Sequence, residues 1–310
     1  MKRIFYILPL LFLSSCTERN QETNSINIVR LDKMLNNNET VPVSLLQPLL
    51  SVFSTQVGEE FTAEMYRNSS YFTIFEKDVT CNLPSLNEVE KDLSSISLNA
   101  ERINIKIPIK NYCGIINPYN QPIIVTDSIV YIGLNHYLGS NYKGYDSFPD
   151  YIRKKKNISR MVYDIVESSL AYFNPYYNGS KSNVLSRIAY EGALAYIAIK
   201  IIPNCDIYSF IGYEKNEKEW INQNISMIWN TLIEKQLLFT SEYIVISKLC
   251  NPAPASNIIC NECPAMIGKY IGYEIIKSYL SNNDVQDISR ILISDFYNAD
   301  DLLIKAKLQL

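Results

Sequence analysis

The chain has 310 residues, 47% apolar and 20% charged, a composition close to the globular average that excludes a wholly disordered chain. Its 29 Lys and Arg residues against 32 Asp and Glu residues leave no positive surplus for phosphate groups, so nucleic acid is not an expected partner. His136 is the single histidine, which excludes zinc sites of the HExxH type because these need two.

The first segment has the features of a bacterial export signal. Two basic residues precede an apolar run over 4–13, which is too short to cross a bilayer as a helix. We interpret residues 1–15 as a signal peptide. The sequence Leu13-Ser14-Ser15-Cys16 resembles a lipobox, which implies that Cys16 is lipidated and becomes the mature N-terminus. Two or three acyl chains would anchor it stably in a membrane, whereas the alternative is an ordinary signal peptide with an incidental cysteine.

The next segment, 16–38, is polar and is predicted to be a flexible tether ahead of a single globular domain over 39–310. Its acidic residues near the lipidation site are few, namely Glu18 and Glu22 with Arg19 between them. Lipoproteins exported to the cell surface tend to carry a stronger acidic cluster there. The sequence therefore favours an outer-membrane lipoprotein that faces the periplasm.

A helix is predicted around 45–53 from its apolar spacing, although Pro48 interrupts it, and another follows over 86–96. The strict alternation of isoleucines over 103–109 indicates a strand, and the runs 123–125 and 129–134 indicate two more. These predicted strands place a small β-sheet at about 100–138.

From there on, the pattern is helical. Helices are predicted over 158–173, 184–201, 215–238, 264–280, 285–293 and 300–308. On the 264–280 helix, Gly268 and Gly272 lie on one face, which indicates a close approach to a neighbouring helix. The fold class predicted is α+β, mainly α-helical, with a helical C-terminal half.

Six cysteines remain after Cys16, an even number that permits three disulfides in an oxidising compartment, with 15 possible pairings. They are Cys81, Cys113, Cys205, Cys250, Cys260 and Cys263. The last two have CxxC spacing. The interpretations left open are thiol redox chemistry, a loop staple and buried free thiols.

The predicted helix 158–173 invites a comparison with zincin peptidases. Tyr163, Asp164 and Glu167 stand where HExxH would place two zinc ligands and the general base, and Glu191 follows at the distance of a third ligand. The strand 129–134 would be the sheet edge that holds a substrate peptide. This resemblance implies a degenerate, zincin-like scaffold without zinc, that is, a pseudo-peptidase with no cofactor.

Alternatives to this interpretation stay open. Glu167 and Glu191 could be ordinary solvated carboxylates or members of a shared polar cluster. In a working enzyme, the catalytic candidates are Asp164, Glu167 and Glu191, and the metal-ligand candidates are Tyr163, Glu167 and Glu191. His136 is more typical of a packed or hydrogen-bonded residue than of a catalyst, and no GxSxG motif accompanies it.

Two further features have an unremarkable interpretation and a functional one. The aromatic residues of the C-terminal half are expected to pack in the core, and a glycan-binding platform would instead need them exposed and coplanar. They are Tyr213, Trp220, Trp229, Tyr270, Tyr273 and Tyr279. The run Lys154-Lys155-Lys156 is predicted to be a solvated turn.

Several sequence blocks, in order, resemble the gliding-motility lipoprotein GldB family of Bacteroidetes. They are the lipobox, 134–139, 187–192, 211–213, Trp220, 228–229, 250–254 and 267–279. The chain departs from the family at Pro264-Ala265, where Pro-Gly is common, and at Tyr270 and Tyr273, where Trp is frequent. As a divergent member, the chain is expected to be a non-catalytic scaffold or adaptor that meets other envelope proteins. The alternatives are a metal-dependent, peptidase-like hydrolase and a glycan-binding envelope module.

Overall fold

The computed structural model describes residues 25–310. The predicted signal peptide, Cys16 and the start of the tether lie outside the described residues. The first strand, β1 (Ile28–Arg30), and the first helix, α1 (Leu31–Asn36), fall inside the range predicted to be tether. Ile28 and Leu31 are buried, so the folded part begins before residue 39.

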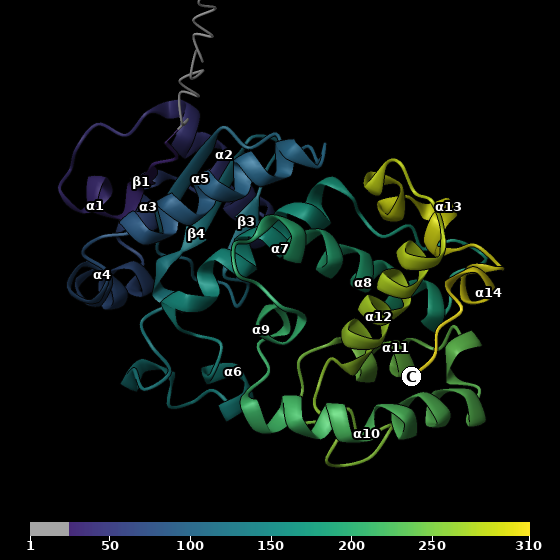
Figure 1. Cartoon of the computed structure of the whole chain (residues 1–310). Coiled ribbons are helices and arrows are strands. Elements are labelled where there is room, and N and C mark those ends of the chain that lie inside the picture. The colour runs from purple at the N-terminus through teal and green to yellow at the C-terminus, as the bar shows by residue number, and fades with distance from the viewer. Residues whose placement is uncertain (1–24) are drawn as a thin grey trace, which may run out of the picture.

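The chain forms one small sheet surrounded by helices (Figure 1). The other strands are β2 (Asn111–Ile115), β3 (Ile123–Val125) and β4 (Ile129–Gly133). The helices before and around the sheet are α2 (Val43–Val57), α3 (Ala63–Arg67), α4 (Ser70–Asn82), α5 (Asn87–Arg102), α6 (Asp150–Arg153) and α7 (Met161–Phe173). The remaining helices are α8 (Val184–Ile201), α9 (Ile207–Ile211), α10 (Lys215–Glu234), α11 (Tyr243–Cys250), α12 (Ile267–Asn282), α13 (Ser294–Tyr297) and α14 (Leu302–Ala306).

The sheet has the strand order β1-β2-β4-β3, with β3 antiparallel to β4 and the other pairs parallel. The predicted strands 123–125 and 129–134 are confirmed as β3 and β4. The predicted strand 103–109 is wrong, since this segment is irregular and the ladder begins at Asn111. Pro108 has no N–H to offer a ladder, and Asn104 has a φ of 56°.

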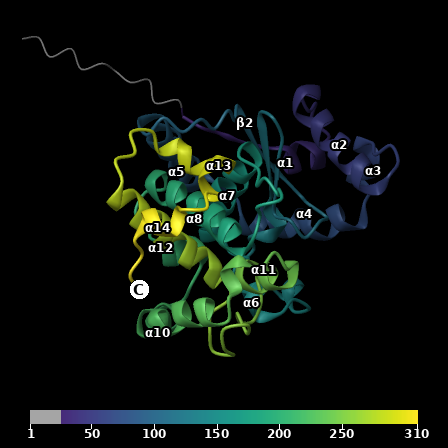
Figure 2. The same cartoon turned by 90° about the vertical axis from the view of Figure 1, so that its right-hand side faces the viewer.

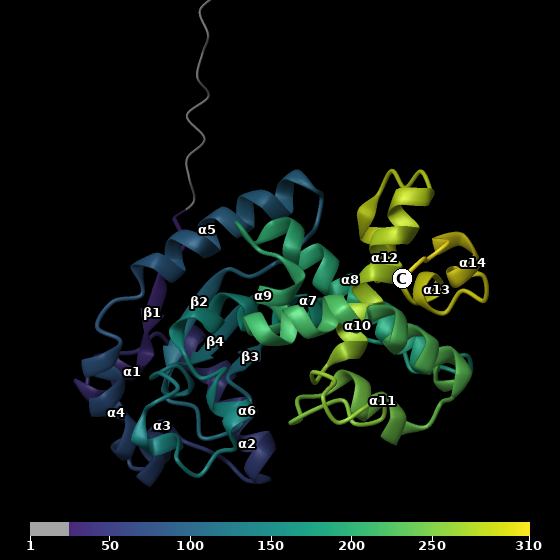
Figure 3. The same cartoon turned by 60° about the horizontal axis from the view of Figure 1, so that its bottom comes forward.

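The edge of the sheet also differs from the prediction. β4 pairs on both sides and is buried along its whole length, so it lies inside the sheet, and the edge strands are β1 and β3. A strand enclosed by helices on both faces has a continuous apolar sequence, which by itself does not indicate its place in the sheet. The helix α5 passes β1 on the outside (Figure 3), where its Glu90 side chain accepts a hydrogen bond from the Ile28 amide at 2.7 Å.

The centre of the helical half is α8, which is buried along most of its length. It matches the predicted range 184–201, and α7, α10 and α12 confirm the predicted helices at 158–173, 215–238 and 264–280 with shifted ends. The 13-residue helix α4 was not predicted, and neither were the shorter helices α1, α3, α6, α9, α11 and α13. Figure 2 shows α12 passing α8 and α10 lying on the outside of the helical half.

The two central helices, α8 and α12, cross at two glycines. A Cβ atom added to Gly272 would lie 1.7 Å from the Ile188 carbonyl oxygen, and one added to Gly192 would lie 2.1 Å from the Gly272 carbonyl carbon. The close helix approach predicted from Gly268 and Gly272 is thus confirmed. One hydrophobic core runs from Ile28 to Ala306. Within residues 25–310, no helix combines the length and apolarity that crossing a membrane requires.

Candidate functional site

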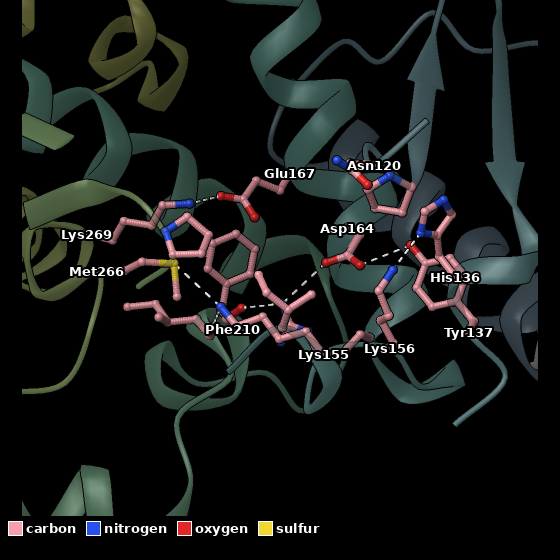
Figure 4. A pocket seen from close by; sticks show the side chains of 15 residues that line it. Asn120, His136, Tyr137, Lys155, Lys156, Asp164, Glu167, Phe210, Met266 and Lys269 are labelled. Carbon is pink, nitrogen blue, oxygen red and sulfur yellow. Dashed lines mark hydrogen bonds and ion pairs between the residues drawn. The ribbon is translucent and has the colours of Figure 1, made fainter. Parts of the chain in front are cut away.

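Two adjoining cavities, of about 280 Å³ and about 1010 Å³, form a single cleft between the sheet edge and the central helices. The two cavities share Asn120, Pro122, Asp164, Glu167, Pro252 and Lys269. Ile124 and Val125 of the edge strand β3 line the larger one. The cleft therefore contains all three acidic residues singled out in the sequence, with Glu191 in the larger cavity only. Figure 4 shows the smaller cavity, called here the lysine pocket.

The helix α7 directs Asp164 and Glu167 into the cleft, because residues three apart lie on one helix face. Tyr163 points elsewhere. Its ring packs against the Arg160 guanidinium, with the carbon of that group 4.7 Å from the ring centre, and against Phe210. Tyr163 lines neither cavity, so the proposed ligand set of Tyr163, Glu167 and Glu191 is not brought together.

Glu167 and Glu191 are brought together by a lysine. The Lys269 ammonium of α12 contacts the Glu167 carboxylate closely and lies 3.6 Å from the Glu191 carboxylate of α8. Arg187, one helical turn before Glu191, donates to the same carboxylate at 2.5 Å. Lys269 can reach both acids because the glycines at the α8–α12 crossing allow the two helices to approach closely. We call this group the Lys269 bridge.

The electrostatics of the bridge favour its ionised form. Burial alone would raise the pKa of Glu167, but the adjacent Lys269 charge lowers that pKa below its ordinary value. Burial acts to lower the pKa of Lys269, and the charges of Glu167 and Glu191 overcome this and raise it. Glu191 is only 7% exposed, so the two carboxylates are not solvated surface groups but members of a shared polar cluster.

The bridge decides what the acids can do chemically. An ammonium group occupies the place between Glu167 and Glu191 that a metal ion held by these two acids would need. Within residues 25–310, no group of three or more His, Cys, Asp or Glu side chains is arranged to hold a metal ion. The donor set therefore does not fit a zincin metal centre.

Asp164 has different partners. Its carboxylate accepts a hydrogen bond from the Tyr137 hydroxyl at 3.0 Å and lies 3.5 Å from the Arg160 guanidinium. Burial raises the pKa of Asp164, and the Arg160 charge opposes this shift in part. Asp164 thus links α7 to the segment after β4 and is not in contact with Glu191.

His136 lies at the far end of the lysine pocket and is 4% exposed. Its Nδ1 is 2.8 Å from the Lys156 ammonium. Burial and the Lys156 charge lower the pKa of His136 to about 3, although the carbonyls of Tyr119 and Asn117 act in the opposite direction. The imidazole is therefore neutral at any physiological pH and serves as a hydrogen-bond acceptor.

The prediction of a solvated turn at 154–156 holds only for Lys154, which is exposed. Lys155 and Lys156 both line the lysine pocket. Lys155 donates to the Ile211 carbonyl at 3.3 Å and lies 3.5 Å from the Met266 sulfur. Burial lowers the pKa of each lysine to about 8. A run of three lysines gives no sign in the sequence of which members turn inward.

The six cysteines of residues 25–310 are free thiols, but Cys81 is exposed and Cys205 and Cys260 are half-buried, so the interpretation as buried free thiols fits only the other three. Cys113, Cys250 and Cys263 are buried, and burial raises the pKa of each thiol to about 12. Cys263 belongs to the CxxC pair, and its raised pKa does not favour a thiolate at this position.

The C-terminal aromatic residues are packed and do not form a platform. Tyr270 is buried, and the other five members of the predicted set are half-buried against the core. A glycan-binding platform would need flat rings open to solvent, and this set does not provide it.

Sequence reasoning found the acids but missed their partners. Arg187 could have been found, because it stands four residues before Glu191 on a predicted helix and this spacing favours an ion pair. Lys269 could not, since its contact with Glu167 spans 102 positions in the chain. The sequence block 267–279 contained it without any local sign of its partner.

The family comparison covers nearly the whole chain. A family model described as gliding motility protein GldB matches residues 16–308. No curated protein and no solved structure matches the chain significantly.

Proposed function

The chain belongs to the family of the gliding motility protein GldB, and from that premise we propose that it is a non-catalytic lipoprotein of the cell envelope. In this proposal Cys16 bears the lipid anchor in the outer membrane. The folded part faces the periplasm and acts as a scaffold or adaptor for other envelope proteins.

The Lys269 bridge is the observation that supports a non-catalytic role. A peptidase of the zincin type needs a Lewis-acidic metal and a free carboxylate as general base. Here Glu167 is paired with Lys269, and Glu191 with both Lys269 and Arg187. A buried carboxylate that is already neutralised by a fixed ammonium group is a poor metal ligand and a weak base. This favours a pseudo-peptidase over the metal-dependent hydrolase.

The sheet edge also fits the proposal. β3, the edge strand, borders the larger cavity, where an extended segment of a partner protein could pair with its free side. A cleft with an open strand edge and without catalytic groups suits binding and not turnover.

A metal analysis of the full chain tests the proposal. The protein is purified in detergent without chelator, and Zn, Mn and Ca are measured per chain by mass spectrometry. We expect all three to be far below one per chain, and equally so in the Glu167→Ala variant. Near-stoichiometric metal that is lost in Glu167→Ala and in Glu191→Ala would overturn the non-catalytic role and direct attention to peptide substrates.

A further inference from the structure

The lysine pocket is a separate compartment of the cleft with its own chemistry. Its volume is about 280 Å³, below the range typical of drug-sized ligands, so an occupant would be small. Part of the wall is apolar, formed by Pro122, Ile152, Phe210, Ile211, Pro252 and Met266. The rest is charged.

The charged part of the wall is mainly cationic. Lys155, Lys156, Arg160 and Lys269 face only Asp164 and Glu167. Of these acids, Glu167 is paired with Lys269, and Asp164 lies beside Arg160. Within residues 25–310, neither Lys155 nor Lys156 has a carboxylate within 4.0 Å. Buried charges in proteins are normally paired, so two lysines without counter-charge on one pocket require an explanation.

Their positions define the two ends of the pocket. Figure 4 shows Lys155 reaching toward Met266 and Lys156 reaching toward His136, with Asp164 between them. Each end thus carries an ammonium group without a carboxylate partner, although that of Lys156 also lies over the rings of Tyr145 and Phe148, 5.1 and 4.7 Å from the ring centres. Neither the Lys155 nor the Lys156 ammonium group is neutralised by a carboxylate.

Two buried polar atoms of the same wall also make no well-aligned hydrogen bond, namely Arg160 Nε and His136 Nε2, although the Tyr119 and Asn117 carbonyls lie near the His136 ring. Arg160 is 8% exposed and His136 4%. Because the Lys156 ammonium donates to Nδ1 of His136, the neutral ring carries its hydrogen on Nε2. Both atoms are therefore donors. They are covered by neighbouring atoms, so a ligand would engage them after a small side-chain rotation or through a bridging water.

We propose that the lysine pocket binds a small organic anion, a carboxylate carried on an apolar body. The two ammonium groups without carboxylate partners and these two donors match a carboxylate, which only accepts hydrogen bonds. The apolar wall matches the body. A free organic acid and the C-terminal residue of a peptide share this chemistry. The inference goes beyond the proposed scaffold role and does not depend on the lipid anchor.

Calorimetry on the full chain in detergent tests this site with 3-phenylpropionate as the probe. The neutral 3-phenylpropionamide has the same shape without the charge. We expect the acid to bind, and the amide to bind at least about tenfold more weakly, as the loss of a charge-assisted hydrogen bond implies. Lys155→Met and Lys156→Met should each weaken the acid by a similar factor. Lys154→Met, on the same segment but exposed, should leave it unchanged.

Lys156→Arg is the control for a folding defect in Lys156→Met. It keeps the positive charge and should therefore retain binding of the acid where Lys156→Met loses it. Equal affinity for the acid and the amide would overturn the proposal. So would unchanged acid binding in both methionine variants, or binding of inorganic phosphate without binding of the acid. N-acetyl-glycyl-phenylalanine, tested beside its C-terminal amide, identifies the source. If N-acetyl-glycyl-phenylalanine binds more tightly than 3-phenylpropionate, the result favours a peptide C-terminus as the natural ligand. If it binds more weakly, the result favours a free organic acid.

The outcome for this site is distinguishable from that for the proposed function. Metal analysis reports on Glu167 and Glu191, whereas the ligand series reports on Lys155 and Lys156. A metal-free chain that binds no carboxylate would leave the scaffold role standing and remove only this inference.

Discussion

At the scale of single residues, Lys269 holds three helices together at one point. Its ammonium group on α12 contacts Glu167 of α7 and Glu191 of α8. Ion pairs of this kind contribute little relative to apolar packing, but removing one partner leaves buried charge uncompensated. Removing one partner of the Lys269 bridge therefore costs more stability than the intact bridge contributes.

Lys269→Met should therefore destabilise the protein by about 3–5 kcal/mol, because the Glu167 carboxylate would lose its counter-charge and Glu191 would keep only that of Arg187. Urea denaturation followed by circular dichroism measures this. The matched control is Lys277→Met on the same helix, where an exposed lysine lies 3.3 Å from Glu274 and should contribute at most about 1 kcal/mol. A Lys269→Met variant as stable as Lys277→Met would show that the bridge is energetically unimportant.

The pocket lysines predict a pH effect. Burial lowers the pKa of Lys155 to about 8. The Arg160 and Lys269 charges act in the same direction, and the charges of Glu167 and Asp164 oppose the shift. Burial against the Asp164 charge lowers the pKa of Lys156 to about 8 as well, beside a neutral His136. Unfolded lysines titrate at about 10.4. Between these values the unfolded chain binds more protons, so this contribution to the free energy of unfolding rises with pH.

Comparison with Lys156→Met isolates this contribution from other titrating groups. From about pH 7.5 to about pH 9.5, the free energy of unfolding of the wild type should rise relative to the variant by about 1–2 kcal/mol. Lys154→Met should show no such change relative to the wild type. A constant difference between wild type and Lys156→Met would mean that Lys156 titrates normally.

Residue-scale chemistry was only half predictable from the sequence. Asp164, Glu167 and Glu191 could be singled out because carboxylates on helices at set spacings are visible in one dimension. The roles of Lys155 and Lys156 depend on which way a short segment turns, and Lys269 pairs across 102 positions. Long-range partners of this kind leave no periodic signal.

At the scale of elements, the crossing of α8 and α12 sets the geometry of the cleft. Gly192 and Gly272 bring the two backbones into contact, and this places Lys269 beside Glu191. A longer side chain at either position would push α12 away and separate the ammonium group from its acids. The glycines are thus positioning residues for the bridge.

Gly272→Ala should destabilise the protein by about 1–3 kcal/mol despite the better helix propensity of alanine, because the added Cβ would overlap the Ile188 carbonyl. Thermal unfolding measures the loss. In Gly179→Ala the added atom would meet only the ring of Tyr177, which is 63% exposed and can move, so little change is expected there. Equal melting temperatures for the two variants would contradict a tight crossing.

Elements were predictable where a long helical run has a clear stop, as for α8, which ends before Pro203 and whose predicted and observed ends agree although it is buried on nearly all sides. The sheet was harder. Over 103–109 the isoleucines are more buried than the residues between them, and Ile105 is buried. Pro108 nevertheless has no N–H for a strand ladder, and no ladder forms. β2, with the sequence Asn-Tyr-Cys-Gly-Ile, is buried on both faces and lacks any alternation to reveal it.

At the scale of the whole molecule, the folded part begins close in sequence to the proposed lipidation site, Cys16. Ile28 enters the sheet at its edge, beside β2. Eleven residues separate it from Cys16, and the fully extended stretch between the two spans at most about 40 Å. An anchored chain would keep its folded part close to the membrane surface.

Cys16→Ser should abolish lipidation. Metabolic labelling with an alkyne-bearing fatty acid, followed by isolation of the protein, should give a labelled wild type and an unlabelled variant. Cys81→Ser, which changes an exposed cysteine of the folded part, should retain the label. Label that persists in Cys16→Ser would place the modification elsewhere and refute the lipobox interpretation.

For a chain anchored at Cys16, the edge position of β1 would have a mechanical consequence. Tension on the anchor would enter the fold at Ile26 and Ile28. A three-residue edge strand held by the ladder alone would peel away under low force. Here the Ile26 and Ile28 amides also bond to the Ser94 and Glu90 side chains of α5, at 2.9 and 2.7 Å. A pull on the anchor would therefore be shared between the sheet and the 16-residue helix α5. The hydrogen bonds to α5 would keep β1 in place at a force that the strand ladder alone could not resist.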